Sequence, residues 1–206
     1  MYSPGHYKVS DEAIIEELVN AESFATLLTP SIPEPVTSHL PFLMDKSDSA
    51  KPKMLSHMAR ANPHWKAFAQ NPSAMLIFQG PHAYISPAWY EPKPDNVPTW
   101  NYAVVHVHGT AKLIEDRERA FLAMQTMVNT FETKYRTGWK LDVPANAGID
   151  ALMNAIVVFE VVELRFEAKF KLSQKHSDVN RKNVIAALDY AGQSELARYM
   201  KRTFET

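Results

Sequence analysis

The segment SHMARANPHW at 56–65 has the residue types best suited to bind an anion. It places His57, Arg60 and Asn62 within one turn of an expected helix start, where Asn62-Pro63 can cap the helix. Main-chain N–H groups are unpaired at a helix N-terminus, and the helix dipole favours negative charge there. Arg60 adds a planar fork of donors that matches phosphate oxygens. The segment therefore predicts a phosphate site, although a plain helix cap and a surface ion pair would use the same residues.

A second polar group ends the most regular strand pattern in the chain. Over 156–172 nearly all even positions are apolar, and the odd positions turn polar from Glu163 on, which predicts a long strand bent by a bulge near Glu160. Lys169, Lys171 and Ser173 share its polar face. Gln174 follows directly. These side chains could meet the same phosphate or the edge of a planar ligand. A solvated strand face is the plainer interpretation.

The segment VPTWNYAVVHVHG at 97–109 combines aromatic and histidine residues on one expected strand. Trp100 and Tyr102 share one face, and Asn101 lies on the other. Aromatic residues at a strand start commonly fill a core or a dimer interface. His106 and His108 also share a face, but no carboxylate or third histidine stands at a suitable local spacing. We therefore expect no metal site.

Several other kinds of chemistry have no supporting motif. The chain has no cysteine, which excludes disulfides and thiolate catalysis. Its six glycines are scattered, so neither a G-x-G-x-x-G fingerprint nor a P-loop is present. G-x-S-x-G and H-E-x-x-H motifs are absent as well. A nucleotide cofactor would have to be held by side chains and a helix end.

The charge balance and the N-terminal segment limit the partners and the location that we expect. Lys plus Arg number 22 against 23 Asp plus Glu, whereas proteins that hold DNA phosphates usually carry a basic excess. The N-terminus lacks a basic region followed by an apolar run, and no apolar stretch reaches the length of a membrane span. We expect a cytoplasmic protein without a membrane partner.

The elements that must position these residues are mostly strands. Alternating and β-branched runs predict strands at 24–29, 36–44, 53–61, 74–79, 82–86, 99–114 and 156–172, with a turn at Gly80-Pro81. Helices are expected at 10–20, capped by Ser10, at 63–70, at 115–134, and in a C-terminal helical tail at about 178–204 that Asp178 caps. So few crossover helices favour a closed barrel, mainly β with peripheral helices, as a single domain over 1–206.

Several of these segments together resemble the PaiB family of FMN-binding negative transcriptional regulators. The similarity runs nearly end to end, through MYSPGHY at 1–7, FATLLT at 24–29, SHLPFL at 38–43, HMARANPHW at 57–65, GPHAYISPAWY at 80–90, VPTWNYAVVHVHG at 97–109 and KLSQ at 171–174. The resemblance implies a six-stranded antiparallel FMN-binding split β-barrel. It also implies a homodimer with FMN at the interface.

The resemblance further implies which residues bind FMN. The SHLPF segment would lie along the isoalloxazine ring, HMARAN would hold the phosphate end, and PTWNY and KLSQ would complete the site from the same or the partner subunit. After KLSQ the family tends to continue with Asn-Arg, where this chain has Lys175-His176. These two residues keep potential positive charge but not the contact of that Asn. The implied cofactor-binding residues are Ser38, His39, Leu40, Pro41, His57, Met58, Ala59, Arg60, Asn62, Trp100, Asn101, Lys171, Ser173 and Gln174.

Different functions are compatible with this assignment. A negative transcriptional regulator would act on DNA or through a protein partner, and its one helix-turn-helix candidate is the tail with Arg198, Lys201 and Arg202. The alternative is a flavin-dependent oxidoreductase of the pyridoxamine phosphate oxidase-like class, since one fold hosts several activities. Haem binding is a third reading, because some split barrels bind haem and the chain has eight histidines.

Overall fold

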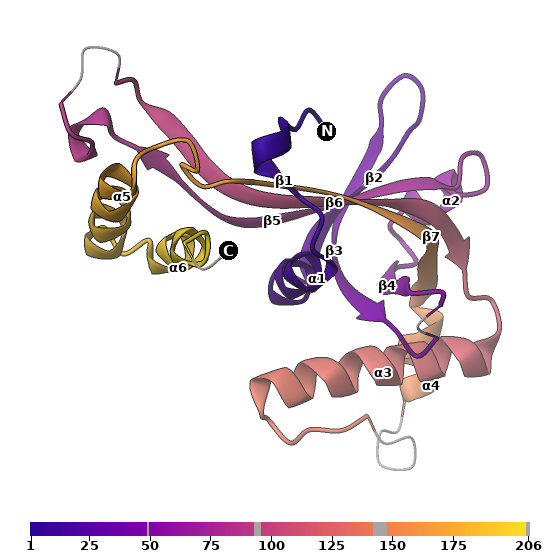
Figure 1. Cartoon of the computed structure of the whole chain (residues 1–206). Helices are drawn as coiled ribbons and strands as arrows, with labels where there is room; N and C mark the ends of the chain where they lie inside the picture. The colour runs from indigo at the N-terminus through magenta and orange to yellow at the C-terminus, as the bar shows by residue number, and fades with distance from the viewer. Residues whose placement is uncertain (49, 93–95, 142–147, 205–206) are drawn as a thin grey trace. The chain divides into compact units, whose positions relative to one another are not determined.

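Three long strands, β5 (Ser73–Ile85), β6 (Thr99–Leu113) and β7 (Ile156–Lys171), run through both of the compact units into which the chain divides (Figure 1). The computed structural model describes residues 1–48, 50–92, 96–141 and 148–204. The first unit comprises Met1–Leu18, Gln79–His106 and Glu167–Thr206, and the second comprises Val19–Phe78 and Val107–Phe166.

A closed six-stranded antiparallel barrel forms the second unit, which confirms the predicted fold. The strand order is β7-β4-β3-β2-β5-β6, and the additional pairing of β6 with β7 closes the sheet. The three shorter strands are β2 (Phe24–Thr29), β3 (Val36–Asp45) and β4 (Lys53–Ala59). Their bounds lie within two residues of the predicted ones, because alternation along each strand is set by which face is buried.

Aromatic side chains from different elements pack against one another in the barrel interior. Phe42 packs edge to face against Phe78 and Phe159, with ring centroids 6.3 and 6.0 Å apart. Phe68, which follows the short helix α2 (His64–Ala67), lies 5.3 Å from Phe159. Pairs in this geometry add to the stability that burial of the rings provides.

One outer face of the barrel is covered by the helices α3 (Arg117–Tyr135) and α4 (Ile149–Asn154). Figure 1 shows α3 next to β4, with α4 beside it. Asp116 caps α3 by accepting a hydrogen bond from the Arg119 main-chain N–H at 2.8 Å. Helix α4 was not predicted, since its six residues are too few for a periodic pattern. The buried contact consists of Leu55, Ile114, Ala120, Ala123, Met127 and Val158.

The predicted turn at Gly80-Pro81 is wrong, because β5 continues through both residues. A Cβ at Gly80 would lie 2.8 Å from Leu18 Cδ1 and 3.2 Å from the Ala103 carbonyl oxygen. Glycine is therefore required here by the close approach of neighbouring elements, which is a known use of glycine within strands. The local sequence carries the signal of a turn, but packing inside the first unit determines the outcome.

The first unit contains the helix α1 (Glu12–Ala21) as far as Leu18, the helices α5 (Asp178–Tyr190) and α6 (Ser194–Arg202), and the short strand β1 (Lys8–Val9), which pairs with β7. Single turns of 3-10 helix lie at Gly5–Tyr7 and Pro87–Trp89. The predicted helix bounds agree to within about two residues, except that α2 has four residues instead of the expected eight. Among the described residues, none of the helices combines the length and the apolar character that crossing a bilayer requires.

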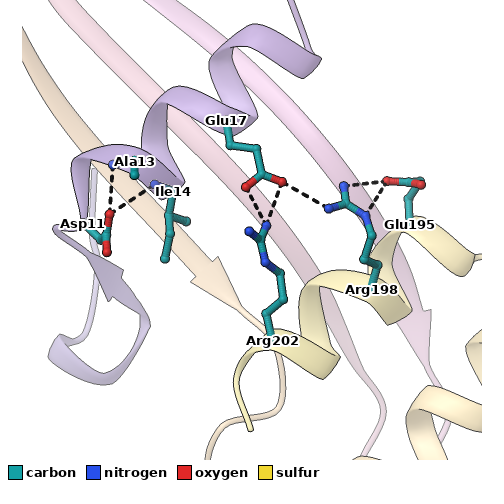
Figure 2. A network of polar contacts seen from close by, with 7 residues as sticks. All are labelled: Asp11, Ala13, Ile14, Glu17, Glu195, Arg198 and Arg202. Carbon is teal, nitrogen blue, oxygen red and sulfur yellow. Dashed lines mark hydrogen bonds and ion pairs between the residues drawn. The ribbon is translucent and has the colours of Figure 1, made fainter. Parts of the chain in front are cut away.

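Two of the predicted helix caps are each displaced by one residue. Asp11, not Ser10, accepts hydrogen bonds from the main-chain N–H groups of Ala13 and Ile14, at 2.9 and 3.2 Å (Figure 2). Ser177, not Asp178, caps α5 by accepting from the Asn180 N–H at 3.3 Å. Both neighbouring residues are good capping types, so composition alone does not decide between them.

Candidate functional site

A chain of hydrogen bonds connects the predicted strand-to-helix junction to the barrel interior. Asn62 Oδ1 accepts from the His64 main-chain N–H at 3.0 Å, which directs Asn62 Nδ2 to Ser38 Oγ at 3.0 Å. Ser38 Oγ also lies 2.8 Å from His64 Nδ1, and His64 Nε2 lies 3.0 Å from Thr29 Oγ1, so both ring nitrogens have a hydrogen-bond partner. Burial lowers the pKa of His64, in keeping with a neutral ring. The polar groups of Ser38 and Asn62 are thus used inside the second unit.

The residues predicted to lie along the flavin ring do not all face the same way: some point into the barrel and others point outward. Side chains at successive strand positions point to opposite faces. Leu40 and Met58 are buried with Ser38 in the barrel interior, so only their main-chain atoms could contact a ligand outside it. The outward-facing residues are His39, Pro41, His57 and Ala59.

An aromatic residue that the sequence analysis did not single out lies beside His39. The β2–β3 register pairs Phe24 with Pro41 and Thr26 with His39. Phe24 is 68% exposed, and its ring centroid lies 6.5 Å from that of His39 at an interplanar angle of 30°. His39 Nδ1 lies 3.1 Å from Thr26 Oγ1, which fixes its ring. The outward parity of Phe24 in FATLLT is the signal that could have identified it.

His57, on the neighbouring strand β4, has a ring nitrogen that is available for a hydrogen bond. Its Nδ1 is buried and has no partner among the described residues. Burial also lowers the pKa of His57, which favours the neutral ring. A buried polar atom without a partner is costly in a native structure, and a ligand can satisfy it. The edge of a flavin ring carries both donors and acceptors, so this position fits the predicted cofactor.

Arg60 holds neighbouring chain segments together through neutral oxygens. Its Nε donates to the Asn154 carbonyl and its Nη2 to the Ile156 carbonyl, each at 2.7 Å. Its own carbonyl accepts from Trp65 Nε1 at 3.1 Å, and the side chain lines a pocket of about 360 Å³. Two guanidinium nitrogens are therefore engaged with the main chain where α4 ends and β7 begins. With only four residues, α2 contributes little of the dipole that the phosphate prediction invoked.

Three further predicted residues, Asn101, Lys171 and Ser173, line a pocket of about 390 Å³ in the first unit. Asn101 is fully buried, and its Nδ2 donates to Ser173 Oγ at 2.8 Å. Asn101 Oδ1 has no partner among the described residues. Lys171 Nζ donates to Thr99 Oγ1 and to the Trp100 carbonyl, the latter at 3.1 Å. The described residues that line it are Tyr7, Asn96, Val97, Thr99, Asn101, Lys171, Ser173, Lys175, His176, Ser177 and Asn180.

Gln174 and Trp100 do not line this pocket. The Gln174 side chain accepts from the Leu172 N–H at 2.7 Å and donates to the Phe170 carbonyl at 2.6 Å, so it closes the end of β7. Trp100 is 48% exposed, stacks on His82 at 5.8 Å and donates to His82 Nδ1 at 3.3 Å. Trp100 thus belongs to an exposed aromatic surface, of which sequence reasoning missed His82.

Eight of the fourteen predicted site residues thus form two groups, one in each unit. We call His39, Pro41, His57, Ala59 and Arg60 the barrel group. We call Asn101, Lys171 and Ser173 the pocket group, together with Lys175, which lines the same pocket but was not predicted. Each group has a buried polar atom without a partner among the described residues, His57 Nδ1 in the first and Asn101 Oδ1 in the second. Both groups therefore fit a ligand that both donates and accepts hydrogen bonds.

Comparison with known proteins identifies relatives of this chain. Residues 1–163 match the family described as "Putative FMN-binding domain". The protease synthase and sporulation protein PAI 2 of Bacillus subtilis (strain 168) is 35% identical over 189 residues, which cover 91% of this chain and 89% of that protein.

Solved structures show a similar fold at low sequence identity. The FAD and haem binding protein from Mycobacterium smegmatis is 13% identical with a TM-score of 0.62, over 88% of this chain and 80% of that one. The flavocytochrome Anf3 from Azotobacter vinelandii is 14% identical with a TM-score of 0.59, over 80% and 69% of the two chains. At such identities the likeness concerns the fold alone.

Proposed function

We propose a function on the premise that this chain belongs to the family described as "Putative FMN-binding domain" and uses FMN as its cofactor. The chain is a PaiB-type flavoprotein that acts in the negative regulation of transcription. The observation that supports flavin binding most directly is the pair of buried, unpartnered polar atoms in the two groups. The name of the Bacillus relative, which concerns protease synthesis and sporulation, supports a role in regulation.

The isoalloxazine ring lies along the barrel group in this proposal. His57 Nδ1 bonds to the ring edge, and the exposed Phe24 and His39 provide flat surface beside it. The pocket group is contributed by the partner subunit of a homodimer, so that two FMN sites lie at the interface. The protein acts in the cytoplasm.

The helical tail gives little support to direct reading of DNA. Glu17 of α1 pairs with Arg198 at 3.1 Å and with Arg202 at 2.6 Å (Figure 2). Glu195 also pairs with Arg198, at 2.9 Å. The hydrogen bond from Arg202 is the main reason why the pKa of Glu17 lies below its usual range.

Lys201 of the same helix also has a carboxylate partner, Asp189, at 2.8 Å. Each cation named in the helix-turn-helix hypothesis therefore has a carboxylate partner within the first unit. Contacts to DNA phosphate would have to replace these pairs, and phosphate contacts supply most of the non-specific affinity for DNA. Regulation accordingly acts through a protein partner or through the state of the bound flavin.

A flavin-dependent oxidoreductase is the second candidate function. FMN supplies hydride and electron chemistry when bound, while the protein orients it and controls access. The exposure of Phe24 and His39 favours this candidate, because a substrate can approach the outer face of β2 and β3. His57, with its pKa lowered by burial, is a neutral hydrogen-bonding group at the same face.

The visible absorption spectrum of the purified protein, with identification of the released cofactor, tests the common premise. We expect one FMN per chain, and a protein that neither carries nor takes up FMN would contradict both candidates. Bleaching of the flavin by NADH or NADPH with turnover would favour the oxidoreductase. Repression in cells that depends on bound flavin, without salt-sensitive retardation of the target promoter DNA by the protein alone, would favour the regulator.

A further inference from the structure

The pocket of the first unit is positively charged. Lys171 and Lys175 both line it, and none of the described lining residues is acidic. No described carboxylate forms an ion pair with either lysine. A concave site with cations and no acidic group raises the local concentration of anions.

Lys171 is a partly buried ammonium group with only neutral oxygens as partners. Two of its three N–H donors point to Thr99 Oγ1 and to the Trp100 carbonyl. Burial accordingly lowers the pKa of this lysine. Removing a charge from water is unfavourable unless an opposite charge compensates it. An anion in the pocket would provide that compensation.

Asn101 indicates that the anion bound in this pocket also carries a hydrogen-bond donor. Its Nδ2 faces both Ser173 Oγ at 2.8 Å and Met200 Sδ at 3.6 Å, which fixes the orientation of the amide. The fully buried Oδ1 is left without a partner among the described residues. Because an amide oxygen only accepts, the ligand must offer a hydroxyl or an N–H beside its anionic group.

The N-terminus of α5 lies at the same pocket. This helix has thirteen residues, and its cap Ser177 and the buried Asn180 both line the pocket. Main-chain N–H groups and the helix dipole attract anions at such an end. The one carboxylate of the first turn, Asp178, is largely exposed and pairs with Arg181 at 3.2 Å.

We propose that this pocket binds the phosphate monoester of a hydroxylated ligand, with Lys171 and Lys175 as its cationic contacts and Asn101 as the acceptor for a ligand hydroxyl. Two sources share this chemistry, the ribityl phosphate of FMN and a separate sugar phosphate. Assignment to FMN depends on the proposed function, whereas the phosphate site depends on the pocket alone. Lys175 is not among the cofactor-binding residues that the resemblance implies. The proposal also moves the phosphate away from Arg60, because Nε and Nη2 of Arg60 already donate to carbonyl oxygens.

Calorimetric titration of the flavin-free full-length protein with inorganic phosphate, FMN and riboflavin tests the proposal. Lys175→Met is the main variant because this side chain is exposed, so its loss should leave the fold intact. Lys171→Met is the second variant, and the exposed Lys182→Met on α5 is the matched control. Loss of one charge-assisted contact should weaken phosphate binding about tenfold or more in either pocket variant. The control should bind like the wild type.

The two sources of phosphate give different patterns. If the phosphate is that of FMN, both pocket variants weaken FMN binding by a similar factor, leave riboflavin binding unchanged, and phosphate competes with FMN. If a separate ligand is bound, FMN and riboflavin affinities stay unchanged and phosphate still binds the FMN-loaded protein. Either pattern supports the site.

Two results would overturn the proposal. One is phosphate binding that is absent, or that is the same in the wild type and both pocket variants. The other is FMN binding that is tighter than riboflavin binding and that is weakened by Arg60→Met but by neither lysine variant. That result would place the phosphate site at the strand-to-helix junction. Failure of the proposed function is distinguishable, because a wild type that binds neither FMN nor riboflavin can still be titrated with phosphate.

Discussion

His64 is the buried centre of the polar chain that links Asn62 and Ser38 to Thr29. Burial lowers its folded-state pKa below the ordinary value of 6.5, so below that pH the unfolded chain binds the proton more readily than the folded protein. The free energy of unfolding should therefore be highest above pH 6.5 and fall as the pH decreases, by up to about 1.4 kcal/mol per pH unit for this group. Urea unfolding of the wild type at pH 8, 7, 6 and 5 measures the slope.

His64→Gln is the matched variant, since it cannot titrate in this range. At pH 8 it should be less stable by about 1–3 kcal/mol, because buried partners lose their hydrogen bonds. Its stability should depend less on pH between 7 and 5 than that of the wild type. Parallel curves for the two proteins would show that His64 does not carry the pH dependence.

Individual site residues were only partly predictable, and the reason is chemical. Ser38 and Asn62 were implied as ligand contacts, yet their polar groups bond to His64, which is distant from Ser38 in the sequence. Gln174 was implied as well, but it bonds to the main chain of its own strand. Residue type shows that a side chain can form a hydrogen bond. The partner is set by tertiary packing, which the sequence pattern does not contain.

At the scale of elements, closure of the barrel depends on a close contact between β6 and β7. A Cβ at Gly109 would lie 2.5 Å from the Val162 carbonyl oxygen and 2.7 Å from Val161 Cγ1. Gly109→Ala should therefore lower the free energy of unfolding by about 1–3 kcal/mol, as expected for overpacking against backbone. Thermal unfolding followed by circular dichroism measures this change.

Gly5→Ala provides the control for that substitution. Nothing lies within 4 Å of a Cβ added at Gly5, so the same chemical change should leave the melting temperature almost unaltered there. Equal melting temperatures for Gly109→Ala and the wild type would contradict the close β6–β7 approach.

Most elements were predictable because local pattern and burial agree in them. The C-terminal part of strand β7 alternates between buried and less buried side chains, and the helix α3 has an apolar face and a capping aspartate. Prediction failed where a local signal and packing disagree, as at Gly80-Pro81 inside β5. It also failed for α4 and β1, which are too short to show a period.

At the scale of the whole molecule, the many strand patterns and few crossover helices favoured a closed barrel. The family resemblance added that the barrel has six antiparallel strands and binds FMN, which the strand patterns alone do not specify. The homodimer could not be derived from the strand and helix patterns, because the patterns of a single chain do not show which surface contacts a second subunit. A test of the homodimer requires two subunits with different substitutions.

Mixed dimers decide whether an FMN site is shared between subunits. One chain carries His39→Ala with His57→Ala, which damages the barrel group, and the other carries Lys171→Met with Lys175→Met, which damages the pocket group. Light scattering should give twice the chain mass of 23.3 kDa for each protein. Each mutant homodimer should bind FMN weakly, because every site lacks one group.

The heterodimer of these two chains, isolated through two affinity tags, should regain one site of wild-type affinity. In a shared site the intact barrel group of one chain meets the intact pocket group of its partner, while the second site combines both damaged groups. Fluorescence titration should therefore give half the wild-type FMN stoichiometry. A wild-type chain paired with a chain carrying all four substitutions is the matched control, and it should have no intact site. If instead that control keeps one tight site and the complementary heterodimer has none, the two groups do not meet across subunits and the shared site is wrong.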